Sequence, residues 1–108
     1  MHLEESAVYD AVRRRLGDQR YNLLYDVIEM NLPMAVKMIQ KAGIEHFHGA
    51  YFRTVDQQIG AMQSGHSHVR EQAKAFCVVF HALFCAIEEL AGFSAMDIPY
   101  TMKYRRWS

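Results

Sequence analysis

The sequence predicts an all-α protein: a compact bundle of four or five helices around a long apolar C-terminal helix at about residues 66–92. Apolar residues recur at spacings of three and four along most of the chain, which is the helical period. The strict alternation typical of half-buried strands is absent. With 51% hydrophobic and 22% charged residues, the 108-residue chain has the composition of one folded domain. We expect residues 93–108 to form a less regular, basic and aromatic tail.

The first half of the chain predicts three helices. Residues 3–16 carry an apolar stripe and end in three arginines, which the helix dipole favours at a C-terminus. Residues 19–30 continue as a second helix. Asn31 is a good N-cap and Pro33 is best tolerated in a first turn, so we expect a break there and a third helix over 33–42.

Residues 45–62 predict a fourth, less regular helix. Gly49 and Gly60 each weaken it by about 1 kcal/mol relative to alanine. Its apolar stripe comprises Phe47, Tyr51, Val55, Ile59 and Met62.

The helix over residues 66–92 is the clearest element and supports the prediction of a dimer. Its apolar residues alternate spacings of four and three, which resembles a heptad seam. Residues 75–87 carry no charge on any face, and a helix that is apolar all round must be buried all round. Three short helices do not cover such a helix completely, so we expect a second copy to cover the rest. The predicted self-association residues are Phe76, Phe80, Phe84 and Ile87.

Charge balance argues against a nucleic-acid binder, and the cysteines and the start of the chain indicate where the protein is located. Twelve basic residues balance twelve acidic ones, whereas nucleic-acid binders usually carry a basic excess. Cys77 and Cys85, eight apart on one helix, lie too far apart for a disulfide, and we expect two buried free thiols. The start of the chain lacks the pattern of a signal peptide, and the 75–87 stretch is too short to span a membrane. We therefore expect a cytoplasmic protein.

The sequence contains no recognisable catalytic motif, which favours a protein that acts by binding. We predict a small regulatory or adaptor protein that works through protein–protein interaction as a homodimer. The C-terminal tail is the predicted partner-binding surface because its composition is typical of interface hot spots. Its residues are Tyr104, Arg105, Arg106 and Trp107.

One alternative is a dimeric DNA-binding regulator with a helix-turn-helix at residues 33–62. The recognition helix would begin near His46. Its only full positive charge is Arg53, which is few for a DNA reader.

A second alternative is a helical bundle that binds a transition metal, the only cofactor we consider, through clustered histidines. The candidate ligands are His46, His48, His66 and His68. A further stripe of Cys77, His81 and Cys85 is better read as core, because apolar neighbours make thiols inert. Several methionines, namely Met30, Met34, Met38 and Met62, form either an adaptable groove or core filling.

Overall fold

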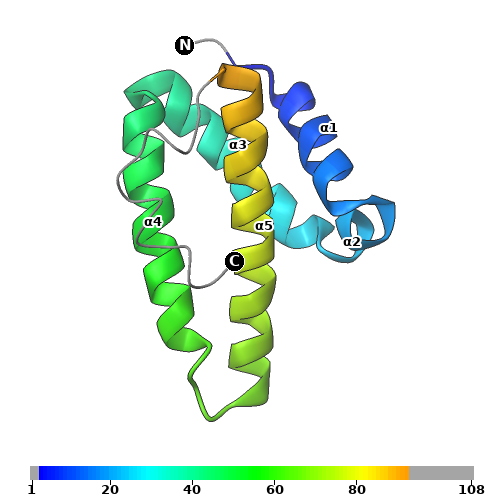
Figure 1. The fold of residues 1–108 in the computed structure, drawn as a ribbon, viewed down its shortest axis with the longest axis vertical. Helices are drawn as coiled ribbons and strands as arrows, with labels where there is room; N and C mark the ends of the chain where they lie inside the picture. The colour runs from blue at the N-terminus through cyan, green and yellow to red at the C-terminus, as the bar shows by residue number, and fades with distance from the viewer. Residues whose placement is uncertain (1–2, 93–108) are drawn as a thin grey trace.

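The computed structural model describes residues 3–92 and confirms the all-α prediction, since its secondary structure in this range is entirely helical. Five helices follow one another with short connections (Figure 1). They are α1 (Glu5–Leu16), α2 (Asp18–Leu23), α3 (Tyr25–Ala42), α4 (Ile44–Ala61) and α5 (Ser67–Ala91).

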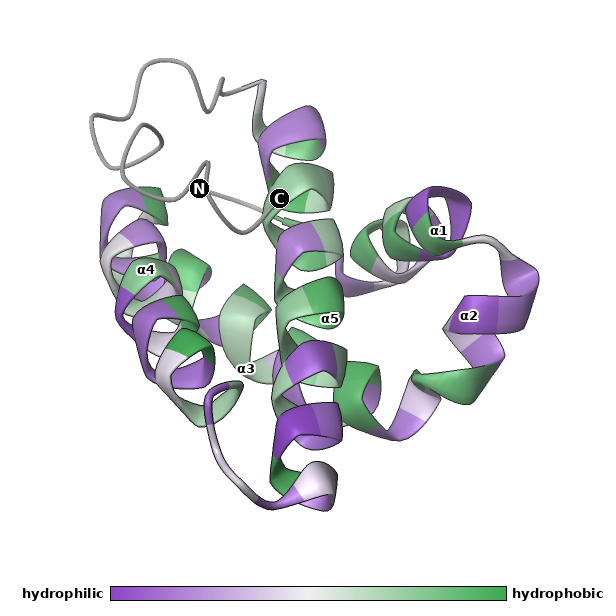
Figure 2. Ribbon diagram, turned by 60° about the horizontal axis from the view of Figure 1, so that its bottom comes forward, coloured by the Kyte–Doolittle hydropathy of each residue, from purple (hydrophilic) through white to green (hydrophobic). Residues whose placement is uncertain are grey.

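The long helix α5 occupies the centre of the bundle. It lies between α4 and α1, with α3 packed behind it (Figures 1 and 2). Nine of its residues are buried, including the fully enclosed Leu83 and Ile87. At about 25 cal/mol per Å² of apolar area removed from water, this burial is a major stabilising contribution of the fold. The predicted central helix is therefore confirmed, and α1, α3 and α4 supply most of its cover.

The predicted break at Pro33 is wrong. Helix α3 runs without interruption from Tyr25 to Ala42, and the chain instead bends at Leu24, between α2 and α3. Pro33 has no N–H, so the carbonyl of Glu29 loses its helical donor. This lost hydrogen bond is the reason why the sequence alone predicts a helix break at Pro33.

Tertiary packing explains why α3 continues through the proline. Ile28 and Leu32, on either side of the missing hydrogen bond, are 1% and 0% exposed. A helix that stopped near Asn31 would displace Leu32, the next residue, from the core. The side-chain amide of Asn31 instead donates to the carbonyl of Val27 at 2.7 Å, within the helix. Burial of apolar side chains outweighs the lost hydrogen bond, as tertiary context commonly outweighs local propensity.

Two glycines make the sharpest helix junctions. Gly17 and Gly43 have backbone φ angles of 82° and 90°, which residues with a Cβ atom rarely adopt. Each allows one helix to end and the next to begin at the following residue. Gly43 alone therefore separates α3 from α4 and places the two long helices side by side.

Replacing Pro33 with alanine restores the donor to the Glu29 carbonyl. We expect the Pro33→Ala variant to be more stable than the native chain by about 1–3 kcal/mol, because interior helical prolines cost roughly that amount. Urea denaturation followed by circular dichroism measures the change. Gln57→Ala, at an exposed position of α4, is the control with little effect. A Pro33→Ala variant of lower stability would contradict the continuous helix.

Candidate functional site

An apolar groove lies where α3, α4 and α5 meet. It encloses about 170 Å³ and is open to solvent on one side. Most of its lining is aliphatic, methionine or aromatic side chain. The lining residues are Asn31, Met34, Ala35, Met38, Phe47, Ala50, Tyr51, Thr54 and Phe80. A groove of this size is smaller than a typical ligand pocket, and its chemistry is suited to one or two apolar side chains from the face of a partner helix.

Packed aromatic rings make the base of the groove rigid. The ring of Tyr51 stacks on Phe84 with centroids 4.4 Å apart, and lies 6.4 Å from both Phe47 and Phe80. By contrast, the rim is adaptable because Met34 is 65% exposed and methionine has three rotatable bonds. The groove thus combines a fixed floor with a side chain that can adjust to an occupant.

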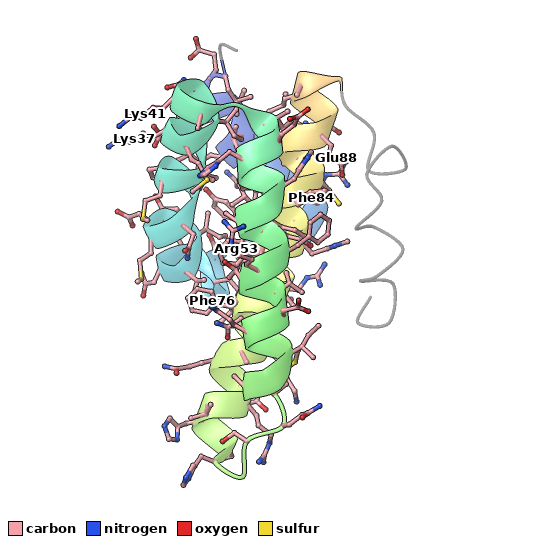
Figure 3. All side chains as sticks on the ribbon, turned by 90° about the vertical axis from the view of Figure 1, so that its left-hand side faces the viewer. Lys37, Lys41, Arg53, Phe76, Phe84 and Glu88 are labelled. Carbon is pink, nitrogen blue, oxygen red and sulfur yellow. The ribbon has the colours of Figure 1, made fainter. Side chains whose placement is uncertain are left out.

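The four predicted self-association residues do not form one surface. Phe84 and Ile87 are buried in the core of the chain itself and are not available to a second copy. Phe76 and Phe80 are half-buried and stack with centroids 5.8 Å apart, and Phe80 lines the groove. Figure 3 shows Phe76 and Phe84 on different sides of α4. Of the predicted set, only these two phenylalanines retain exposed surface.

Most of the exposed apolar surface lies elsewhere than the sequence predicts. Within the described residues, four of the six large hydrophobic side chains that are exposed fall in the segment 23–34. They are Leu23, Tyr25, Met30 and Met34. The periodicity of the methionines was visible in the sequence, but their outward orientation depends on where α4 and α5 pack against α3.

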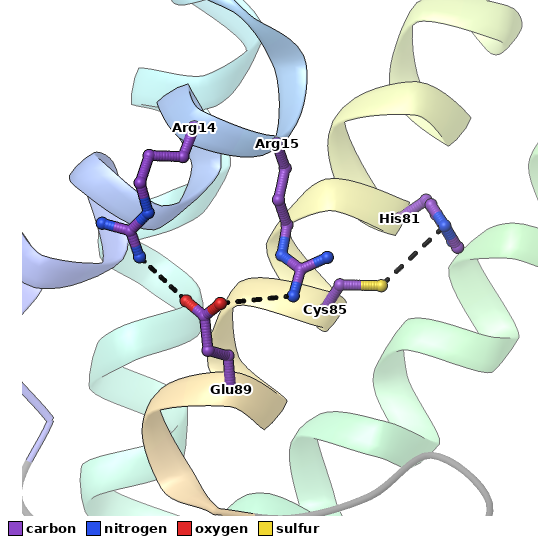
Figure 4. A network of polar contacts seen from close by, with 5 residues as sticks. All are labelled: Arg14, Arg15, His81, Cys85 and Glu89. Atoms are coloured by element: carbon purple, nitrogen blue, oxygen red, sulfur yellow. Dashed lines mark hydrogen bonds and ion pairs between the residues drawn. The ribbon is translucent and has the colours of Figure 1, made fainter.

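A polar network joins the end of α1 to the end of α5 (Figure 4). Arg14 contacts one carboxylate oxygen of Glu89 at 2.9 Å, and Arg15 contacts the other at 3.5 Å. All three side chains are partly exposed. Such surface pairs contribute only about 0–1 kcal/mol each, so they add little to the stability of the fold.

The neighbouring Cys85 and His81 have the residue types of a nucleophile and its base. The Sγ atom of Cys85 lies 3.8 Å from Nε2 of His81. Burial raises the pKa of the Cys85 thiol, although Arg15 partly opposes this. Desolvation and the charge of Arg15 lower the pKa of His81. Both shifts favour a neutral thiol and a neutral imidazole, so a thiolate would form by transfer of the thiol proton to His81.

The predicted four-histidine metal site is not assembled. His46 and His48 lie at the start of α4, while His66 and His68 lie at the start of α5, at the opposite end of this antiparallel pair (Figure 1). His48 is buried against the ring of Phe84, at 4.8 Å, whereas the other three are exposed. Among residues 3–92, no three His, Cys, Asp or Glu side chains are grouped to hold an ion.

The helices over residues 33–62 differ from a helix-turn-helix. A helix-turn-helix uses a turn of three or four residues, whereas Gly43 alone joins α3 to α4. The helix that would read DNA buries Phe47, Tyr51 and Val55 in the bundle. Its exposed cation, Arg53, is its only lysine or arginine. Neither feature supports base readout, and DNA binding stays an untested prediction.

The predicted partner-binding residues Tyr104, Arg105, Arg106 and Trp107 lie outside the described residues. No helix within residues 3–92 has both the length and the apolar character of a membrane span. In comparisons with known proteins, no family model, no curated protein and no solved structure matches this chain.

One buried carboxyl group has an unusual environment that the sequence did not reveal. Glu88 of α5 is 8% exposed, and its Oε2 has no hydrogen-bond partner among the described residues. It lies one helical turn from Phe84 (Figure 3). Burial raises the pKa of Glu88 to about 7, although Arg15 partly opposes the shift.

The raised pKa makes the stability of the protein depend on pH near neutrality. The folded state holds the Glu88 proton more tightly than the unfolded chain, so this contribution is complete below about pH 4.5 and is lost as the pH rises through 7. Between pH 5 and 8, we expect the native chain to lose up to about 3 kcal/mol relative to Glu88→Gln.

Urea denaturation at a series of pH values measures this difference in unfolding free energy. Glu29→Gln, at an exposed position, is the control and should follow the native curve. If the difference between the native chain and Glu88→Gln is the same at pH 5 and pH 8, Glu88 does not titrate in this range.

Proposed function

We propose that this chain is a small regulatory or adaptor protein that acts through protein–protein contacts as a homodimer. The observation that carries the proposal is the apolar groove between α3, α4 and α5, together with the exposed apolar side chains beside it. The proposed location is the cytoplasm, where free thiols such as those of Cys77 and Cys85 stay reduced.

The shape and chemistry of the groove favour the apolar face of a partner helix. Two long, adjacent helices, α3 and α4, supply most of its lining, and α5 contributes Phe80. Helix-in-groove recognition uses apolar anchors at three- and four-residue spacing. Thr54, which is half-buried in the lining, supplies a hydroxyl suited to orienting such a helix.

A displayed library of amphipathic helical peptides tests this function directly. We expect selection on the native protein to enrich peptides with apolar residues at helical spacing. Thr54→Lys places a charge in the groove and should weaken the enriched peptides at least about 10-fold, because buried anchors carry most of the binding energy of an interface. Isothermal titration calorimetry with synthetic peptides measures the effect.

Gln63→Lys, an exposed position after α4, is the matched control and should bind as the native chain does. Peptides that bind Thr54→Lys as tightly as the native protein would place their site outside the groove. A selection that enriches no helical pattern would contradict helix recognition.

A further inference from the structure

The outer face of α3 carries an ordered row of side chains. At about 100° of rotation per residue, positions 26, 30, 34, 37 and 41 fall within a sector of about 80°. These positions hold Asp26, Met30, Met34, Lys37 and Lys41. The row forms one stripe along the helix, and we refer to it as the α3 outer face.

The α3 outer face is exposed to solvent in the single chain. Met30 and Met34 are 66% and 65% exposed, and the three charged residues are exposed as well. Figure 3 shows Lys37 and Lys41 pointing away from α4 and α5. Two adjacent, largely exposed methionines leave apolar area in water that an association would remove.

Charge is distributed along the α3 outer face with opposite signs at its two ends. Asp26 lies in the first turn of α3 and Lys41 in the last, about 22 Å apart along the axis. The ion pairs within residues 3–92 lie on α1, α2 and α5 and leave Asp26, Lys37 and Lys41 unused. The charges also suit the dipole of α3 itself, but the dipole does not explain outward methionines between them.

We propose that two copies of this chain associate through the α3 outer face, with the two α3 helices antiparallel across a two-fold axis near Met34. In this arrangement Asp26 of each copy faces Lys41 of the other. Met34 lies against Pro33 of the second copy near the axis, and Met30 lies against Lys37. This inference rests on the proposed homodimer and specifies its interface.

The pattern fits a second copy because it is complementary to itself. A two-fold axis brings the same surface of both copies together, so an acidic end must meet a basic end. Antiparallel packing achieves this twice per dimer, and the helix dipoles also align favourably. The methylene stem of Lys37 can cover Met30 while its ammonium group approaches Asp26. Most of the lining of the groove lies beside this face and stays available to a partner.

Charge reversal with complementary mixing tests the interface. Sedimentation equilibrium measures the dissociation constant of the native chain, Asp26→Lys, Lys41→Glu, and an equimolar mixture of the two variants. Each variant alone places like charges opposite each other at two points, so we expect its dimer to weaken about 10- to 100-fold. The mixture restores opposite charges at both points and should recover a dimer with near-native affinity.

Glu71→Lys and Lys74→Glu are matched controls, because they reverse the same charges on exposed positions of α5. Both controls should dimerise as the native chain does, and Met34→Lys should be monomeric. A native dimer that persists in both α3 variants, or variants that stay monomeric when mixed, would overturn the antiparallel interface and leave the homodimer standing. A native chain that is monomeric would overturn the interface and the homodimer together.

Discussion

The burial of α5 is the constraint on which the rest of the structure depends. Its apolar residues occupy several faces of the helix, so one neighbour cannot remove them from water. Helices α1, α3 and α4 surround it, and Leu83 and Ile87 are completely enclosed as a result. The short α2, which buries none of its residues, serves mainly to reverse the chain so that α3 can pack behind α5.

This arrangement determines where the chain has apolar surface left over. Because α5 uses α3 as cover, the buried face of α3 is fixed by Ile28, Leu32 and Ile39. The opposite face must then carry Met30 and Met34 into solvent. The groove arises at the edge of the same contact, where Phe80 emerges between α3 and α4. The groove and the α3 outer face, the two surfaces proposed for association, thus both follow from the packing of α3 against α5.

The sequence predicted the helical class and most of the helices, because three- and four-residue apolar spacing is a local property of the chain. It failed at Pro33, where long-range burial of Leu32 outweighed a local hydrogen-bond loss. The sequence also could not distinguish Phe84, which faces the core, from Phe76, which keeps exposed surface. Which side of an apolar helix faces a neighbour depends on tertiary packing.

The candidate site was less predictable than the fold for the same reason. The predicted break at Pro33 divides the segment of α3 between two short helices, so the sequence alone does not place Asp26 and Lys41 on one helix face. The histidine clusters stayed an alternative as a metal site because the sequence shows their spacing but not the antiparallel course of α4 and α5. Glu88 gave no signal, since its burial arises entirely from tertiary packing.

Hydrogen exchange of the α5 amides at increasing dilution tests the central claim most directly. If α1, α3 and α4 cover α5 within one chain, protection over residues 75–87 stays at the level of global unfolding at every protein concentration. Residues 75–87 that exchange faster than global unfolding allows once the protein is diluted to the monomer would contradict the account, because a second chain would then provide the cover of α5.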